Sequence, residues 1–202
     1  MSFIQHQARE RSMELAQERG VFPNFSGSTY DRPGGMELRN ATLTTIAPTG
    51  TLSLLANCSS GIEPLFAIRY TRKALEDMEF QVTDPLFIEL GEQKGFLNPE
   101  LLKALSEGAS LQDLPQVPKE ITELFITTFE IPPVWHVKIQ AAFQEYTDNA
   151  VSKTINFPRD ATKEEVREAF LMAYQERCKG ITIYRSGSKP SQVLACGTKQ
   201  VC

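Results

Sequence analysis

Histidine and cysteine are scarce in this sequence: its 202 residues include two histidines and four cysteines. So few cysteines cannot form the dense disulfide framework that stabilises small secreted domains. His6 and His136 lie far apart, and no CxxC or HExxH spacing occurs. We therefore expect no Cys/His metal site in this chain.

Long apolar runs and an excess of basic residues are also missing. No stretch of about 18 apolar residues is present, which argues against a membrane span, and the first residues carry too much charge for a secretory signal. A formal net charge of −4 provides no general basic field for nucleic acid or anionic lipid. We therefore expect a cytoplasmic protein in a reducing compartment, with no nucleic-acid or membrane partner.

The first half of the sequence is typical of helices joined by irregular segments. An amphipathic helix is predicted within residues 1–20, with one side formed by Ile4, Ala8, Leu15 and Ala16. Further along, residues 84–130 are predicted to form a peripheral helical region, because two Asp-Pro or Asn-Pro pairs provide an N-cap residue followed by proline.

The last third of the sequence predicts a βαβ unit, preceded by a helix over residues 133–146. Residues 151–156 and 181–184 are predicted strands, and Thr162 with Glu165 forms a capping box that starts the helix between them. The core stripe of that helix is expected to be Val166, Ala169, Phe170, Ala173 and Tyr174. A crossover of this length joins parallel strands with a right-handed connection.

Only one more strand, over residues 42–47, is predicted with the same clarity. Three strands are too few to close a barrel. The sequence therefore predicts an α/β fold that forms part of a larger sheet or barrel.

A hydroxyl-rich turn after the strand predicted over 42–47 is the strongest candidate site. It comprises Pro48, Thr49, Gly50, Thr51, Leu52 and Ser53. Free N–H groups at a helix start, the positive end of the helix dipole and small hydroxyl donors together favour an anion such as phosphate. The alternative is that Thr51 or Ser53 only caps the helix.

Four other residues have a functional and a structural interpretation. Cys58 is expected to be a small buried residue rather than a reactive thiol, and His136 to be packed rather than catalytic. Lys153 and Arg185 lie in or at the ends of predicted strands, where a charged residue either faces an anionic ligand or is solvated.

Glu63 and the C-terminal cysteines leave their interpretations open too. The Glu63 carboxylate either bonds backbone amides of the neighbouring loop or faces water. Residues 187–202 are predicted to be a flexible tail that carries Cys196 and Cys202. These thiols either exchange with a disulfide in a buried site or merely belong to an unstructured terminus.

Four segments together resemble a known family. Residues 40–53, 59–64, 148–156 and 178–184 resemble the C-terminal part of the ribonucleotide reductase catalytic subunit. The sequences of these segments are most similar to those of the adenosylcobalamin-dependent class II enzymes.

The resemblance implies a fold and a division of the chain. Residues 1–186 would be the C-terminal section of a ten-stranded α/β barrel with peripheral helices, and 187–202 its cysteine-bearing tail. The turn at 48–53 corresponds to the family's loop for substrate phosphates, so a ribonucleoside di- or triphosphate is the expected substrate and adenosylcobalamin the expected cofactor. Cys196 and Cys202 resemble the family's redox shuttle, which a thioredoxin-like reductant would serve.

The sequence also departs from the family's pattern. The Asn-x-Cys-x-Glu motif that carries the radical cysteine is absent, as are the two cysteines of the active-site disulfide. No catalytic residue is therefore assigned here, and a partner chain or segment from the N-terminal side is expected to supply the radical cysteine. The alternatives are a non-catalytic nucleotide-binding or regulatory module, and a class I-like subunit that uses a separate radical-generating protein.

Overall fold

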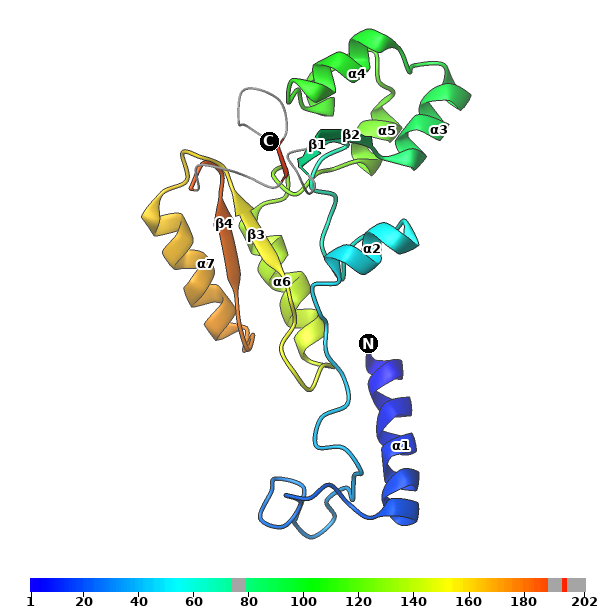
Figure 1. The fold of residues 1–202 in the computed structure, drawn as a ribbon. Helices are drawn as coiled ribbons and strands as arrows, with labels where there is room; N and C mark the ends of the chain where they lie inside the picture. Colours follow the sequence, from blue (N-terminus) through cyan, green and yellow to red (C-terminus); the bar gives the residue numbers. More distant parts are fainter. Residues whose placement is uncertain (74–78, 189–193, 196–202) are drawn as a thin grey trace.

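The computed structural model describes residues 1–73, 79–188 and 194–195. It is an elongated molecule in which α1 lies at one end, a helical group at the other and a βαβ unit between them (Figure 1). The helices are α1 (Ser2–Arg19), α2 (Gly50–Ala56), α3 (Pro85–Lys94), α4 (Pro99–Ser106), α5 (Lys119–Leu124), α6 (Pro133–Gln144) and α7 (Lys163–Gln175). The strands are β1 (Arg69–Lys73), β2 (Glu79–Thr83), β3 (Thr154–Phe157), β4 (Thr182–Arg185) and β5 (Leu194–Ala195).

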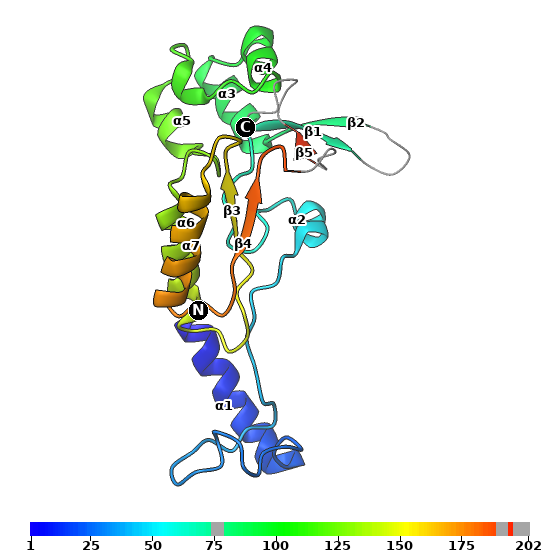
Figure 2. The same cartoon turned by 90° about the vertical axis from the view of Figure 1, so that its left-hand side faces the viewer.

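The predicted βαβ unit is confirmed. Strands β3 and β4 pair in parallel, with Ile155 opposite Ile183. Helix α7 joins them and begins with the expected capping box, in which Thr162 and Glu165 bond to each other's backbone N–H groups. Figure 2 shows α6 and α7 covering the same face of this pair of strands, while α2 lies toward the other face.

The core stripe expected on α7 is only partly right. Ala169 and Ala173 are buried, but Phe170 and Tyr174 are 50% and 83% exposed. Adjacent residues on a helix point about 100° apart, so the two pairs cannot both face the strands. The small alanines do, and they pack in a cluster with Val137, Ile155, Phe157 and Ala161.

The strand predicted over residues 42–47 is wrong as a strand, because it forms only an isolated parallel bridge between Ile46 and Val151. Side chains replace part of the ladder. The Leu43 N–H donates to the Asp148 carboxylate at 2.8 Å, and the Thr44 hydroxyl accepts from the Asp148 N–H at 3.0 Å. The segment therefore runs beside the approach to β3 without a regular ladder.

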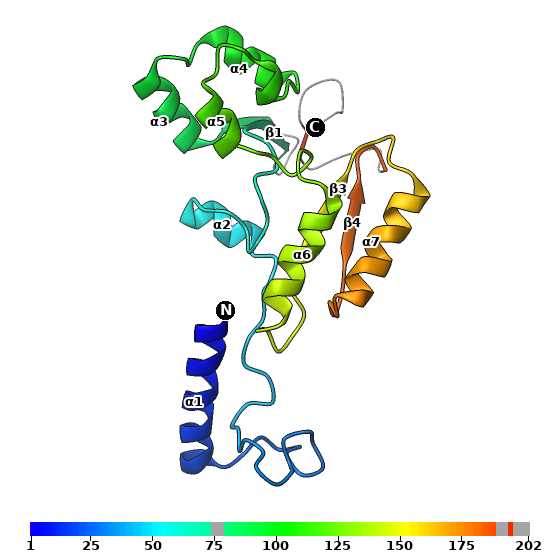
Figure 3. The same ribbon diagram turned by 180° about the vertical axis from the view of Figure 1, so that it is seen from behind.

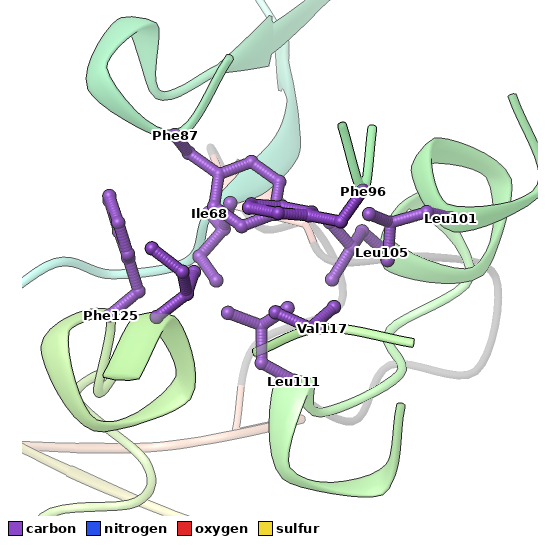
Figure 4. Packing of buried hydrophobic residues seen from close by; sticks show 9 residues of the cluster. Ile68, Phe87, Phe96, Leu101, Leu105, Leu111, Val117 and Phe125 are labelled. Atoms are coloured by element: carbon purple, nitrogen blue, oxygen red, sulfur yellow. The ribbon is translucent and has the colours of Figure 1, made fainter. Parts of the chain in front are cut away.

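The helices expected within 84–130 are present as α3, α4 and α5. Asp84 and Asn98 cap α3 and α4 by accepting from backbone N–H groups, and each helix starts with proline. These helices enclose a separate apolar core, shown in Figure 4. It consists of Ile68, Phe87, Phe96, Leu101, Leu105, Leu111, Val117, Ile121 and Phe125.

A second sheet lies beside these helices and was not predicted from the sequence. Strands β1 and β2 form an antiparallel hairpin, and β5 pairs with the other edge of β1. Strand β5 belongs to the segment predicted as a tail, so two residues of that segment are paired. Among the described residues the strands form these two separate sheets and no closed barrel; the division at residue 186 stays a prediction.

Helix α1 is present as predicted, and its expected side is partly right, since Ala16 is buried and Ala8 and Leu15 are half-buried. Gln5, Ser12 and Ala16 are buried, whereas Ile4 is 55% exposed. This face is polar because it docks through hydrogen bonds: Gln5 donates to the Asp148 carboxylate, and the Ser12 hydroxyl accepts from the Asn40 N–H. In Figure 3 the chain continues from α1 through a looped segment and then an extended stretch to α2. No helix in the described part of the chain has the length and apolarity needed to cross a membrane.

Candidate functional site

Residues 48–53, here called the hydroxyl loop, follow the isolated bridge between Ile46 and Val151. Just before the loop, the Ile46 carbonyl accepts from the Ser152 N–H at 2.8 Å. Thr49 then adopts a left-handed backbone with φ of 50° and is the N-cap of α2. This conformation is unfavourable for a β-branched residue and persists only where surrounding contacts enforce it.

Those contacts come from the segment that follows α2. The Gly61 N–H donates to the Thr49 hydroxyl at 3.1 Å, and the Ser60 hydroxyl donates to the Pro48 carbonyl. Gly61 itself has a φ of +56°, and a Cβ at this position would lie 3.2 Å from the Ala47 carbonyl oxygen. Hydrogen bonds from residues 60 and 61 therefore hold the start of the hydroxyl loop in place.

The interpretation of Thr51 or Ser53 as the cap of α2 is wrong. The N-cap is Thr49, and its side chain makes no capping hydrogen bond. The Ser53 hydroxyl instead donates to the Gly50 carbonyl at 2.8 Å. The first N–H groups of a helix have no acceptor within the helix, and the Thr49 side chain does not supply one at α2. Whether the loop binds phosphate stays a prediction.

Glu63, ten residues after the hydroxyl loop, and Lys153, just before β3, form an ion pair in which the lysine is buried. The Lys153 Nζ lies 2.6 Å from the Glu63 carboxylate, with the lysine side chain 1% exposed and the glutamate 25% exposed. The same Nζ donates to the Thr154 carbonyl, and the other Glu63 oxygen accepts from the Thr154 N–H, both at 2.6 Å. Burial lowers the pKa of Lys153, and the hydrogen bond to Glu63 opposes that shift.

These contacts settle several alternatives left open by the sequence. Lys153 faces neither solvent nor an open anion site. Glu63 does bond a backbone N–H, but that of Thr154 at the start of β3 rather than an amide of the neighbouring loop. The signal for Lys153 was present in the sequence: strand alternation places it on the same face as Val151 and Ile155, which are both buried. Arg185, at the end of β4, is exposed.

His136 is packed, as expected. It is 2% exposed, and its Nε2 lies 3.2 Å from the Thr128 carbonyl oxygen. Burial lowers the pKa of His136, and the nearby charge of Lys153 lowers it further. The ring is therefore neutral at pH 7 and makes a structural contact.

The structure describes the surroundings of two cysteines, Cys58 and Cys178. Cys58 is exposed, so the expectation of a buried residue is wrong; it follows α2, which buries none of its residues. Cys178 is half-buried, and burial raises the pKa of its thiol, which disfavours the reactive thiolate. Cys196 and Cys202 lie outside the described residues.

A cavity of about 770 Å³ lies elsewhere, between α1, α6 and the turn from α7 to β4. Its wall carries both signs of charge, including Arg9, Lys179 and Asp148, and no residue of the hydroxyl loop. In the described ranges, no group of three or more His, Cys, Asp or Glu side chains is arranged so that it could hold a metal ion.

Comparison with known proteins identifies the fold. Residues 34–184 match the family model described as ribonucleotide reductase, barrel domain. The chain is 46% identical over 200 residues to a vitamin B12-dependent ribonucleoside-diphosphate reductase of Thermoplasma acidophilum, covering 99% of this chain and 26% of that protein. A protein of the same name from Mycobacterium tuberculosis is 42% identical, with 96% and 28% covered.

A solved structure agrees with these sequence matches. The alpha subunit of the Actinobacillus ureae class Id ribonucleotide reductase superposes with a TM-score of 0.71 at 26% identity, covering 91% of this chain and 32% of that one. The chain thus spans about a quarter to a third of the length of these relatives. From its sequence and its fold alike, the chain belongs to the ribonucleotide reductase barrel-domain family.

Proposed function

We propose that this chain is the C-terminal section of a vitamin B12-dependent ribonucleotide reductase and that its hydroxyl loop binds the phosphates of the substrate. An N-terminal segment, in the same polypeptide or as a partner chain, supplies the rest of the ten-stranded barrel and the radical cysteine. The short span of the chain relative to its relatives supports this division, since it matches only 26% of the Thermoplasma acidophilum protein.

The open start of α2 is the observation that carries the phosphate assignment. Its N-cap side chain accepts from Gly61 rather than from the helix, which leaves the first-turn N–H groups without a side-chain cap, and Thr51 next to them is exposed. Hydrogen bonds from such groups to a charged phosphate each contribute about 1.5–3 kcal/mol. Anchoring the phosphates fixes the ribose relative to the radical cysteine of the upstream segment.

The reduction consumes two electrons and two protons for each nucleotide, and the 2′-hydroxyl leaves as water. A pair of thiols supplies both by closing to a disulfide. We propose Cys196 and Cys202, outside the described residues, as the pair that passes electrons from a thioredoxin-like reductant to the barrel. Ribonucleoside diphosphates are the proposed substrates, in line with the names of the two most similar relatives reported above.

Adenosylcobalamin is the proposed cofactor, and when bound it supplies the radical. The buried histidine is not available to it, because His136 is 2% exposed and its Nε2 faces the Thr128 carbonyl. We therefore assign no cobalamin contact to this chain and derive no step through the cofactor.

The class Id alpha subunit found among solved structures favours one second candidate, a subunit that relies on a separate radical-generating protein. The B12-dependent relative is more similar in sequence, at 46% against 26% identity. A requirement for adenosylcobalamin in nucleotide reduction separates the two candidates.

Replacing Thr51 by Val together with Ser53 by Ala tests the phosphate assignment in the complete reductase. We expect the KM for CDP to rise about tenfold, equal to about 1.4 kcal/mol, with a small change in kcat. Thr29→Val with Ser26→Ala removes two exposed hydroxyls before residue 40 and is the matched control. An unchanged KM in the loop variant would refute the assignment.

A further inference from the structure

The buried pair of Glu63 and Lys153 lies between the sheet and the hydroxyl loop without belonging to either. Lys153 precedes β3, and Glu63 follows the segment that braces the loop. We propose that Glu63 and Lys153 are positioning residues, which lock the hydroxyl loop to strand β3 in the geometry that binds substrate phosphates. This inference rests on the function proposed above for the loop.

The sheet side of the connection is fixed by three short contacts. Glu63 spans Lys153 and the backbone N–H of Thr154 with its two oxygens, while the Lys153 Nζ also bonds the Thr154 carbonyl, each at 2.6 Å. The backbone N–H and the backbone carbonyl of Thr154, the first residue of β3, are therefore both hydrogen-bonded to the pair. Such charge-assisted, bidentate contacts fix orientation as well as distance.

The loop side of the connection runs through residues 60 and 61. The Glu63 N–H donates to the Ser60 carbonyl at 3.0 Å. The Ser60 hydroxyl and the Gly61 N–H then hold Pro48 and Thr49, the first two residues of the loop. A continuous series of hydrogen bonds therefore leads from β3 to the N-cap of α2.

Stability alone does not require an ion pair at this position. Replacing a buried ion pair by apolar residues of similar size is often neutral or stabilising, whereas removing one partner leaves a costly unpaired charge. An apolar pair would fill the same space but make none of the three directional contacts. The substitution of both residues therefore separates a positioning role from a purely structural one.

The test is Glu63→Met with Lys153→Met in the complete reductase. We expect the enzyme to fold, with a thermal unfolding midpoint lowered by the loss of both backbone partners of Thr154, the KM for CDP to rise about tenfold and kcat to change little. The matched control is Lys94→Met with Glu120→Met. It removes an ion pair of the same 2.6 Å length between α3 and α5, with both side chains at least 41% exposed, and leaves the KM unchanged.

A parent-like KM in the Glu63→Met, Lys153→Met enzyme overturns the inference if the Thr51→Val, Ser53→Ala enzyme has a raised KM. If the KM is unchanged in both variants, the proposed function of the loop fails as well. If the double-methionine enzyme does not fold, Glu63→Asp decides. Its carboxylate keeps the charge but is one methylene too short to reach both partners, so a raised KM at constant kcat supports the inference and an unchanged KM overturns it.

Discussion

Lys153 shows that the tertiary surroundings of a residue decide whether its charged side chain is buried or solvated. Its alternation with Val151 and Ile155 indicates an inward side chain, yet its charge argues for solvent or a ligand. The structure resolves this conflict with Glu63, which is 90 positions away in the sequence. Short-range pattern predicts which face a residue occupies, but a partner at such a distance depends on tertiary structure and could not be predicted.

His136 provides a prediction at the same scale. Because burial and the charge of Lys153 lower its pKa below the usual 6.5, the ring stays neutral at pH values where an ordinary histidine is half protonated. NMR titration of the purified chain, with His6→Gln to assign the two ring signals, measures this directly. A His136 signal that titrates at or above pH 6.5 would contradict the account.

The same shift predicts how stability depends on pH. The unfolded chain binds a proton at His136 near pH 6.5, whereas the folded chain does so only at lower pH. Stability is therefore greatest above pH 6.5 and is lost as the pH falls from there toward the folded pKa. In His136→Gln this contribution to the pH dependence of the unfolding midpoint should disappear; an unaltered pH profile would argue against it.

Elements were predicted best where a local chemical signal defines an end. Asp84-Pro85, Asn98-Pro99 and the Thr162–Glu165 capping box each mark a real helix start. Strands with mixed polarity were harder: the β1–β2 hairpin was missed because Arg69–Lys73 is rich in charge and alternates weakly. The strand predicted over 42–47 fails for the opposite reason, since the side chain of Asp148 takes an N–H that a backbone ladder would use.

The capping box of α7 yields a prediction at this scale. Thr162→Ala removes the hydroxyl that accepts from the Glu165 N–H, and should lower the free energy of unfolding by about 1 kcal/mol. Thr162→Ser keeps the acceptor and serves as the control. Urea unfolding measures both, and equal stability of the alanine and serine variants would show that the cap contributes nothing.

At the scale of the whole molecule, α2 is a helix whose apolar side chains are left exposed. It has no buried residue, and Leu52 and Leu55 are 64% and 81% exposed. Exposed apolar side chains on a short helix are typical of a surface that another segment covers. The βαβ unit and the turn at residues 48–53 could be predicted from the sequence. The arrangement of the remaining barrel strands could not, because in the proposed assembly those strands belong to residues outside this chain.

This exposure predicts the effect of a charge on α2. In the complete reductase, Leu55→Asp should weaken the association of this chain with the N-terminal segment, because burying an unpaired carboxylate is costly. Leu124→Asp on α5, where the leucine is 61% exposed, is the matched control. Co-purification of the two parts, expressed as separate chains, gives the measurement; equal recovery of both variants would place the interface elsewhere.

Reduction of CDP by this chain, with and without its N-terminal segment and adenosylcobalamin, tests the central proposal most directly. We expect no dCDP from the chain alone, and formation of dCDP only when the N-terminal segment, adenosylcobalamin and a dithiol reductant are all present. Turnover by the isolated chain, or reduction by the complete assembly without adenosylcobalamin, would contradict it.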